Sequence, residues 1–168
     1  MYRIPLALVA LVLIVLGVFL YTEKDVPDYT SEAYGISFSY PEGYLISEGA
    51  VGNDHYAIRL VREEDAIPPE NGEGPTGVTI DIYANNTLPL SEWVATSNLS
   101  NFTLGDKSST PTTVSGVPAV SYRWSGLYEG ETTAFLYNGN VVAVSVMRIK
   151  PEEHTEAYEE LLSSFELR

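Results

Sequence analysis

Residues 132–149, TTAFLYNGNVVAVSVMRI, decide the fold, because they predict a β-hairpin whose second strand must be covered on both faces. Asn138 and Gly139 are residue types that tolerate the two positive φ angles of a type I′ turn. Beyond that turn, residues 141–147 are apolar on both faces of the expected strand. A strand of this kind lies inside a protein, with a layer packed on each side. The stretch therefore predicts a central sheet between two layers.

The turn also sets the register of the two strands. Tyr137 faces Asn140, and counting outward along both strands places Glu129 opposite Arg148. Opposite charges at directly opposed positions stabilise an antiparallel pair. We predict a structural ion pair between Glu129 and Arg148.

After the hairpin, the sequence predicts a helix from Pro151 to about Phe165. Proline is favoured at the first helical position, and Glu152 and Glu153 would lie in the first turn, where the helix dipole favours acidic side chains. The apolar residues that follow recur at the spacing of one helix face. They are Ala157, Tyr158, Leu161, Leu162 and Phe165. This stripe can cover one face of the sheet.

Before the hairpin, several segments alternate apolar and polar residues with the period of two that is typical of half-buried strands. These segments are residues 34–40, 44–47, 55–62, 78–84, 112–114 and 119–125. Residues 63–77 are rich in proline, glycine and acidic side chains, which indicates an exposed loop.

A second helix is expected between the strands, from an N-cap at Ser91 to about Asn101. Trp93, Val94 and Leu99 would face the core. Two helices and a sheet covered on both faces predict an α+β fold. We expect a three-layer α/β/α arrangement in which helices flank a mainly antiparallel central sheet, preceded by a single N-terminal transmembrane helix.

That transmembrane helix is predicted from Ile4 to Leu20, where 17 residues, IPLALVALVLIVLGVFL, contain no polar or charged side chain. At 1.5 Å per residue the segment spans about 26 Å, close to the thickness of a bilayer core. Bulky residues follow it where signal peptidase needs small ones, which favours an uncleaved signal-anchor over a cleaved signal peptide. Arg3 precedes the segment and acidic residues follow it, so the N-terminus is expected inside and the rest outside.

The chain is thus divided into a cytoplasmic N-terminus (residues 1–3), a transmembrane signal-anchor (4–21), a polar tether (22–33) and one extracytoplasmic domain (34–168). We expect a single-pass protein of the plasma membrane. The formal net charge of −14 disfavours binding to nucleic acid and favours cations or basic partners, although an acidic surface also simply keeps a domain soluble. The absence of cysteine excludes disulfides and thiol catalysis.

Residues 35–44, GISFSYPEGY, resemble the opening of PsbP-like domains, which are related to an extrinsic subunit of photosystem II. Tyr44 stands where that family usually has tryptophan. Three later segments match the family in order: residues 91–93 (SEW), 116–119 (GVPA) and 161–165 (LLSSF). The resemblance covers about residues 34–168. It implies a three-layer fold and a non-enzymatic accessory or binding role, often at a membrane complex, in a membrane-anchored bacterial branch of the family.

Candidate chemistry is sparse. No Gly-x-Ser-x-Gly motif is present, and the two histidines have no suggestive Ser-His-Asp spacing. His154 is expected to pack on the apolar edge of the last helix, and His55 follows Asp54 at a strand start. Neither pattern indicates a hydrolase or a transferase, so we predict no enzyme activity and no cofactor.

A divalent cation is the best of the chemical alternatives. Glu152, Glu156 and Glu160 recur every four residues along the expected last helix and are the candidate ligands of calcium or manganese. A solvated helix face explains the same pattern without a metal. Two hypotheses remain: a membrane-tethered accessory domain that binds a protein partner on the outer face of the membrane, or a module that binds a divalent cation or a small ligand.

Overall fold

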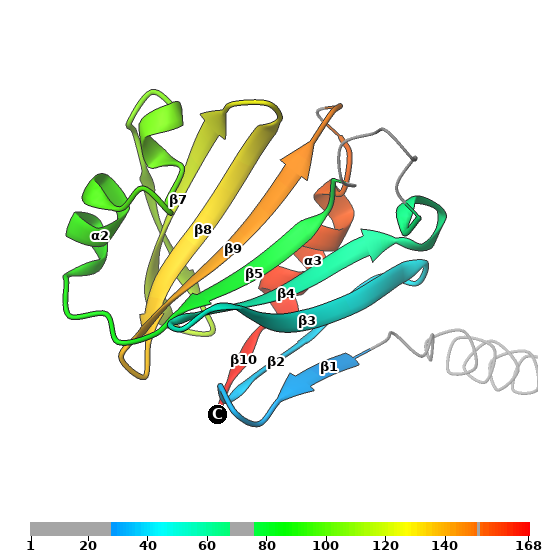
Figure 1. Ribbon diagram of the computed structural model, residues 1–168, viewed down its shortest axis with the longest axis horizontal. Helices are drawn as coiled ribbons and strands as arrows, with labels where there is room; N and C mark the ends of the chain where they lie inside the picture. The colour runs from blue at the N-terminus through cyan, green and yellow to red at the C-terminus, as the bar shows by residue number, and fades with distance from the viewer. Residues whose placement is uncertain (1–27, 68–75, 151) are drawn as a thin grey trace, which may run out of the picture.

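The computed structural model describes residues 28–67, 76–150 and 152–168. Its main element is a seven-stranded sheet (Figure 1). The strands are β3 (Tyr44–Gly52), β4 (His55–Arg62), β5 (Val78–Tyr83), β6 (Thr110–Val114), β7 (Val117–Ser125), β8 (Glu129–Tyr137) and β9 (Asn140–Arg148). They lie in the order β3-β4-β5-β9-β8-β7-β6, and every neighbouring pair is antiparallel.

The hairpin of β8 and β9 confirms the prediction from the sequence. Asn138 and Gly139 both have positive φ angles, 49° and 74°. Tyr137 pairs with Asn140, and the predicted register continues to the far ends of the two strands. β9 lies in the middle of the sheet between β5 and β8, which explains why both of its faces are apolar.

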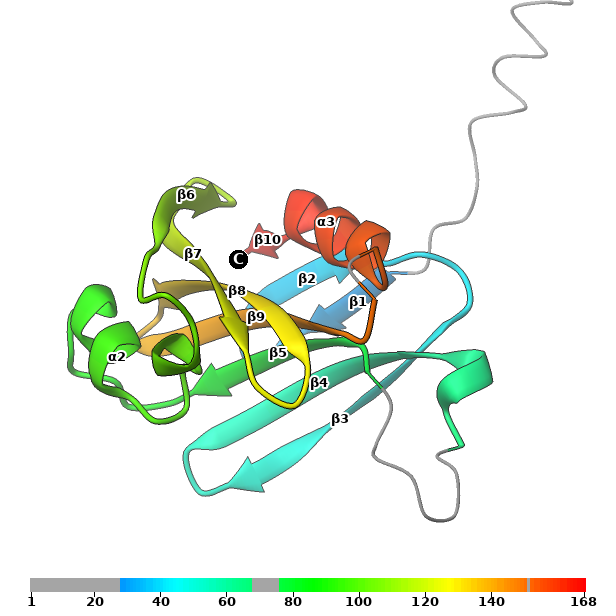
Figure 2. The same cartoon turned by 90° about the horizontal axis from the view of Figure 1, so that it is seen from above.

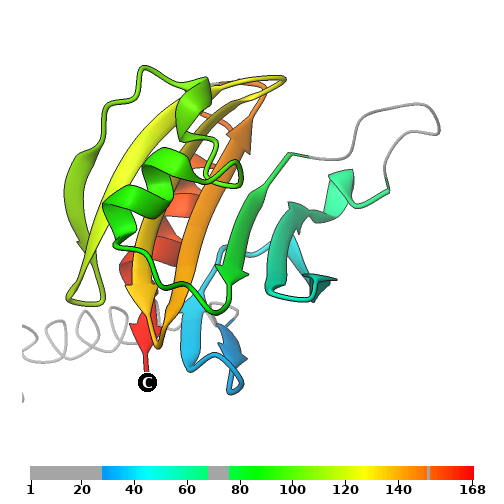
Figure 3. The same cartoon turned by 60° about the vertical axis from the view of Figure 1, so that its left-hand side comes forward.

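Different elements cover the two faces of the sheet. Helix α3 (Thr155–Ser164) covers one face together with a small sheet of β1 (Asp28–Ser31), β2 (Ile36–Ser39) and β10 (Glu166–Leu167) (Figure 2). Helix α2 (Leu90–Thr96) and the 3-10 turn η2 (Phe102–Leu104) cover part of the opposite face (Figure 3). A second 3-10 turn, η1 (Glu63–Asp65), follows β4. The α+β class and the mainly antiparallel sheet flanked by helices are confirmed.

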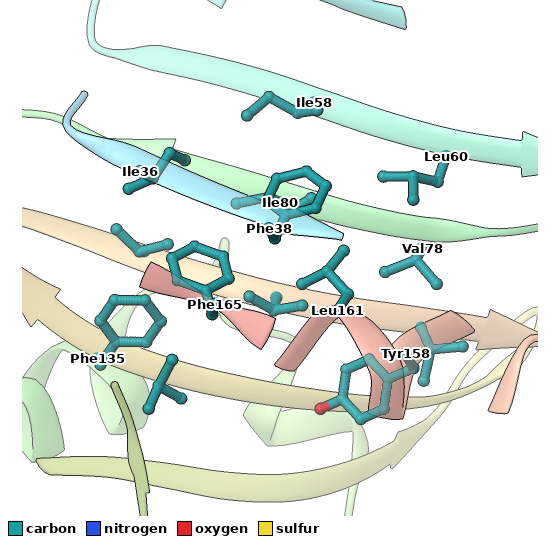
Figure 4. Packing of buried hydrophobic residues seen from close by; sticks show 14 of the residues in the cluster. Ile36, Phe38, Ile58, Leu60, Val78, Ile80, Phe135, Tyr158, Leu161 and Phe165 are labelled. Atoms are coloured by element: carbon teal, nitrogen blue, oxygen red, sulfur yellow. The ribbon is translucent and has the colours of Figure 1, made fainter. Parts of the chain in front are cut away.

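The larger hydrophobic core lies between the sheet and the α3 layer (Figure 4). Ile36 and Phe38 from β2 meet Phe165 there, and the rings of Phe38 and Phe165 stack at 5.8 Å between centroids. β4, β5 and β9 contribute rows of buried aliphatic side chains, and α3 contributes Leu161. A smaller core under α2 contains Trp93, Val94, Tyr122, Trp124, Ala134, Val141 and Ala143.

The domain begins earlier than the sequence predicts. The tether was expected to end at Ala33, but β1 (Asp28–Ser31) already pairs with β2 along its whole length. The physical reason is a stacked contact between Tyr29 and Phe38, with 5.0 Å between ring centroids. The predicted span at residues 4–21 and the first part of the tether lie outside the described residues. No helix in the part of the chain that the structure describes is long and apolar enough to cross a bilayer.

Helix α2 is shorter than predicted. It begins at Leu90 with Pro89 at the N-cap, so the predicted N-cap at Ser91 is wrong. It ends at Thr96 because the next residue, Ser97, is extended. Leu99 is therefore exposed, whereas the predicted core positions of Trp93 and Val94 are confirmed.

Candidate functional site

An open groove of about 550 Å³ lies between α3 and the edge of the large sheet at β6 and β7. β6 is the last strand of the sheet, and the groove runs beside it on the face that α3 covers. We call this the α3 groove. Its lining residues are Thr112, Thr113, Val114, Ser121, Arg123, Glu131, Thr133, Arg148, Thr155, Tyr158, Glu159, Leu162 and Ser163.

Hydroxyl groups form the neutral part of the groove floor. The Thr133 Oγ1 lies 2.8 Å from the Tyr158 Oη and 2.9 Å from the Ser121 Oγ. Burial raises the pKa of Tyr158 to about 12, although its hydrogen bond with Thr133 lowers it. The tyrosine hydroxyl is therefore protonated at neutral pH, and this part of the floor carries no charge.

The charged part of the floor is an arginine pair that shares one carboxylate. The Glu131 Oε2 lies 3.5 Å from the Arg123 Nε and 3.7 Å from the Arg148 Nη1. The predicted ion pair between Glu129 and Arg148 is therefore wrong, although the two residues do face each other in the register. A long side chain reaches the diagonal position across two strands, and Glu131 lies at that position for Arg148.

Arg148 is the least satisfied of these groups. Its side chain is 12% exposed, whereas that of Arg123 is 85% exposed. The Arg148 Nε is buried without a hydrogen-bond partner, and the 3.7 Å contact with Glu131 is longer than a normal hydrogen bond. A nearly buried cation with an unpaired N–H donor is costly, and a guanidinium favours a carboxylate or carbonyl oxygen as a partner. The groove can therefore accept an oxygen-bearing group at this point.

A second depression, of about 460 Å³, shares Arg123 and Arg148 with the α3 groove and lies beside the turn between β7 and β8. Trp124 and Gly130 face each other across these two strands and line it. The Trp124 indole N–H donates to the Thr132 hydroxyl at 2.9 Å. The arginine pair thus lines two hollows of the surface.

A smaller cleft of about 210 Å³ opens on the opposite face of the sheet. The His55 Nε2 lies 2.7 Å from the Asp81 Oδ1, and the His55 ring stacks on Tyr83. The histidine therefore pairs with Asp81 on the neighbouring strand, not with Asp54, its neighbour in the sequence. Thr79 donates to the other Asp81 oxygen at 3.1 Å. His55 and Thr79 each contact one oxygen of the Asp81 carboxylate, so both oxygens have a partner. We therefore interpret His55, Thr79 and Asp81 as a structural hydrogen-bonded cluster.

The predicted row of metal-ligating carboxylates is not formed. α3 begins at Thr155, so Glu152 lies before the helix, while Glu156 and Glu160 lie on it. The helical path breaks at His154, which has a φ of 55°. Within residues 28–67, 76–150 and 152–168, no group of three histidine, aspartate or glutamate side chains could hold a metal ion.

The prediction that His154 packs against the domain is confirmed, because its side chain is completely buried. Its predicted place on the helix is wrong, because His154 is the N-cap residue of α3. Its Nδ1 lies 2.9 Å from the Tyr44 hydroxyl and its Nε2 lies 3.1 Å from the Thr76 hydroxyl. One imidazole therefore joins the start of β3, the segment before β5 and the start of α3.

We expect this arrangement to make the fold sensitive to acid. Burial lowers the pKa of His154, and the nearby Arg62 lowers it further. In the unfolded chain a histidine has a pKa of about 6.5. Because the unfolded state then binds the proton more readily, the free energy of unfolding should fall as the pH drops below about 6.5. Urea denaturation of wild type and His154→Gln at pH 7 and pH 5 tests this. The variant should lose less stability than wild type over this interval, and equal losses would contradict the prediction.

Comparison with solved structures shows what the fold resembles. The solution structure of cyanobacterial PsbP (CyanoP) from Synechocystis sp. PCC 6803 matches with a TM-score of 0.59 and 10% sequence identity, over 88% of this chain and 95% of that chain. The Saccharomyces cerevisiae Ran-binding protein Mog1p matches with a TM-score of 0.49 and 12% identity, over 86% and 96%. The second likeness is too remote to carry an argument. No protein-family model and no curated protein sequence matches the chain.

The chain therefore has a PsbP-like fold. The resemblance noted in the sequence is confirmed at the level of fold, because the match to the cyanobacterial protein covers almost all of both chains. At 10% identity the match shows the fold alone.

Proposed function

We propose that this protein is a membrane-tethered accessory domain that binds a protein partner in the α3 groove and catalyses no reaction. The observation that carries the proposal is Arg148, a nearly buried arginine whose Nε has no hydrogen-bond partner. A partner that brings a carboxylate or carbonyl oxygen into the groove would satisfy this guanidinium. Arginine in a desolvated pocket is a frequent anchor of protein interfaces.

The groove favours a partner that docks by its side chains. β6 is an edge strand with four exposed residues, and an edge strand is a potential site for strand addition. Pro111 lies within β6, where its missing N–H interrupts a continuous ladder. The polar floor beside this edge then offers the stronger contact, through Arg148 and the hydroxyls of Thr133 and Tyr158.

The membrane tether rests on the sequence. The apolar residues from Ile4 to Leu20, with Arg3 before them, support a single-pass protein of the plasma membrane with its domain on the outer face. The PsbP-like resemblance implies an accessory role at a membrane complex. A net charge of −14 disfavours nucleic acid as a partner.

Site-specific photo-cross-linking of the full-length protein in its own membranes tests the proposal. A photoreactive residue at Thr112, which lines the groove and pairs with Ala119 on the face that α3 covers, should give a specific adduct with a protein partner. The same residue at Val51, an exposed position on β3 at the other edge of the sheet, is the matched control and should give none. Equal labelling from the two positions, or none from Thr112, would overturn the proposal.

The role of Arg148 is tested in the same assay. Since a hydrogen bond to a charged group contributes about 1.5–3 kcal/mol, Arg148→Gln should reduce the Thr112 adduct about tenfold or more. Arg59→Gln removes the same charge from the opposite face of the sheet and should leave the adduct unchanged. A circular dichroism melt of each variant shows whether the fold is kept, and Arg148→Lys, which keeps the charge, should restore part of the yield.

A further inference from the structure

One end of the large sheet collects the most exposed apolar side chains. β4 and β9 end there, and β5 and β8 begin there, because Leu60 pairs with Val78, Val78 with Val146, and Glu129 with Arg148. We call it the anchor-side end. Three connections lie at this end, and their described residues are 63–67 with 76–77, 126–128, and 149–150 with 152–154.

Each of these three loops carries a strongly exposed apolar residue. Ile67, Leu127 and Ile149 are 89%, 75% and 69% exposed, more than any other large hydrophobic side chain among the described residues. Single exposed apolar residues are common on protein surfaces and need no explanation. Ile67, Leu127 and Ile149 come from separate loops but lie at the same end of the domain. Exposed apolar side chains arranged in this way are typical of a contact surface.

The N-terminal chain joins the domain at this same end. Asp28, the first residue of β1, pairs with Ser39 at the end of β2, and the chain then turns directly into β3, where Tyr44 pairs with Arg62. Six residues, 22–27, separate Asp28 from the apolar segment and Tyr21. A chain of that length spans at most about 25 Å. An anchored domain is therefore held close to the bilayer by the end that carries Ile67, Leu127 and Ile149.

We propose that the anchor-side end rests on the lipid surface and that Ile67, Leu127 and Ile149 enter the boundary between headgroups and acyl chains. The inference rests on the anchoring part of the proposed function. Glu63 and Glu64 lie in the same connection as Ile67, and their negative charges disfavour an anionic surface, so the contact is apolar and suits an uncharged lipid surface. Tethering makes the contact intramolecular, so weak insertion is enough to orient the domain. Arg148 lies at this end, so the α3 groove would open close to the membrane.

The chain contains no cysteine, so a single introduced cysteine can carry an environment-sensitive fluorophore without ambiguity. Full-length Leu127→Cys and Val51→Cys are labelled and reconstituted into phosphatidylcholine vesicles. Val51 is the matched control, because it is an exposed apolar residue near the opposite end of the sheet. Emission from position 127 should shift to the blue and resist a soluble quencher. The fluorophore at position 51 should show no blue shift, so its emission wavelength should equal the value measured in buffer without detergent.

A second comparison tests whether the three loops act together. With the label at Ile67→Cys, the double substitution Leu127→Ser/Ile149→Ser should return the emission toward its value in buffer. The control substitution Leu88→Ser/Val51→Ser removes exposed apolar side chains elsewhere on the domain, and it should leave the emission of the label at position 67 unchanged.

Vesicle flotation of the same samples separates the two proposals. Protein that floats but shows no blue shift at position 127 overturns lipid docking and leaves the proposed function standing. Protein that does not float overturns the anchoring and the docking together. A blue shift seen only in native membranes, and not in pure lipid, means that a protein covers this end and overturns the lipid contact.

Discussion

Replacing Phe135 with alanine is expected to lower the free energy of unfolding by about 3–5 kcal/mol. Phe135 lies on β8 in the larger core, beside Phe165, and is completely buried (Figure 4). Its ring packs edge-on against Phe165, with 5.6 Å between the centroids. Truncation removes this contact and leaves a cavity between the sheet and the segment after α3, which neighbouring strands are too constrained to fill.

Urea denaturation followed by tryptophan fluorescence measures this change. Leu127→Ala is the control, because it removes a large apolar side chain that is exposed, and it should alter the free energy of unfolding by no more than about 0.5 kcal/mol. A Phe135→Ala loss as small as that of the control would mean that the core is not packed as described. The control also shows that Leu127 is free for a role outside the fold.

Adding a methyl group at Gly130 should also destabilise the domain, by about 1–3 kcal/mol or more. A Cβ atom at this position would come within 2.2 Å of the Trp124 Cζ2. The indole is buried and is held by its hydrogen bond to Thr132, so it cannot move without loss of packing. Glycine at position 130 is therefore required by the tryptophan opposite it on β7.

The test is a double-mutant cycle of Gly130→Ala with Trp124→Leu. In the Trp124→Leu background, Gly130→Ala should lower the free energy of unfolding much less than it does in wild type. Additive losses of stability would contradict the proposed clash. Gly49→Ala on β3 is the matched control. A Cβ atom there meets nothing within 4 Å, so its effect on stability should be small.

The sheet was predictable wherever local chemistry determines the outcome. The Asn138-Gly139 turn sets the register of β8 and β9, and period-two alternation identifies β4 and β5 almost to the residue. In the small sheet, the alternation at residues 34–40 identifies β2 (Ile36–Ser39), but it does not identify the two strands that pair with β2. β10 (Glu166–Leu167) is two residues long and pairs with β2 from the other end of the chain. No local sequence pattern predicts β10, because these two residues form a strand only where the end of α3 places them beside β2.

The start of α3 shows how tertiary contacts override a helix signal. Pro151 and the acids after it are typical of a first helical turn, yet the helix begins at Thr155. The Glu153 carboxylate accepts hydrogen bonds from the backbone N–H groups of Ile149 and Lys150, at 2.8 Å and 3.4 Å, and His154 is drawn into the core by Tyr44 and Thr76. Burial raises the pKa of Glu153, but these backbone hydrogen bonds, together with the nearby His154 and Arg62, lower it overall. Because the helix begins only at Thr155, Glu152 lies outside it, and the predicted row of three glutamates along one helix is not formed.

The α3 groove was also beyond sequence reasoning. Its residues come from β6, β7, β8, β9 and α3, so no spacing in the chain reveals it. The register did place Arg148 correctly on β9, but it assigned the wrong partner. The choice between Glu129 and Glu131 depends on the reach of a side chain, which strand pairing alone does not determine.

The order of the strands has a consequence for how the protein folds. The large sheet consists of two meanders, β3-β4-β5 and β6-β7-β8-β9, in which each described strand pairs with its neighbour in sequence. The two meanders meet only at β5 and β9, where Val78 pairs with Val146. Each meander can form through short-range contacts, whereas their union must close a long stretch of chain. Their docking along β5 and β9 is therefore expected to be the slow step of folding.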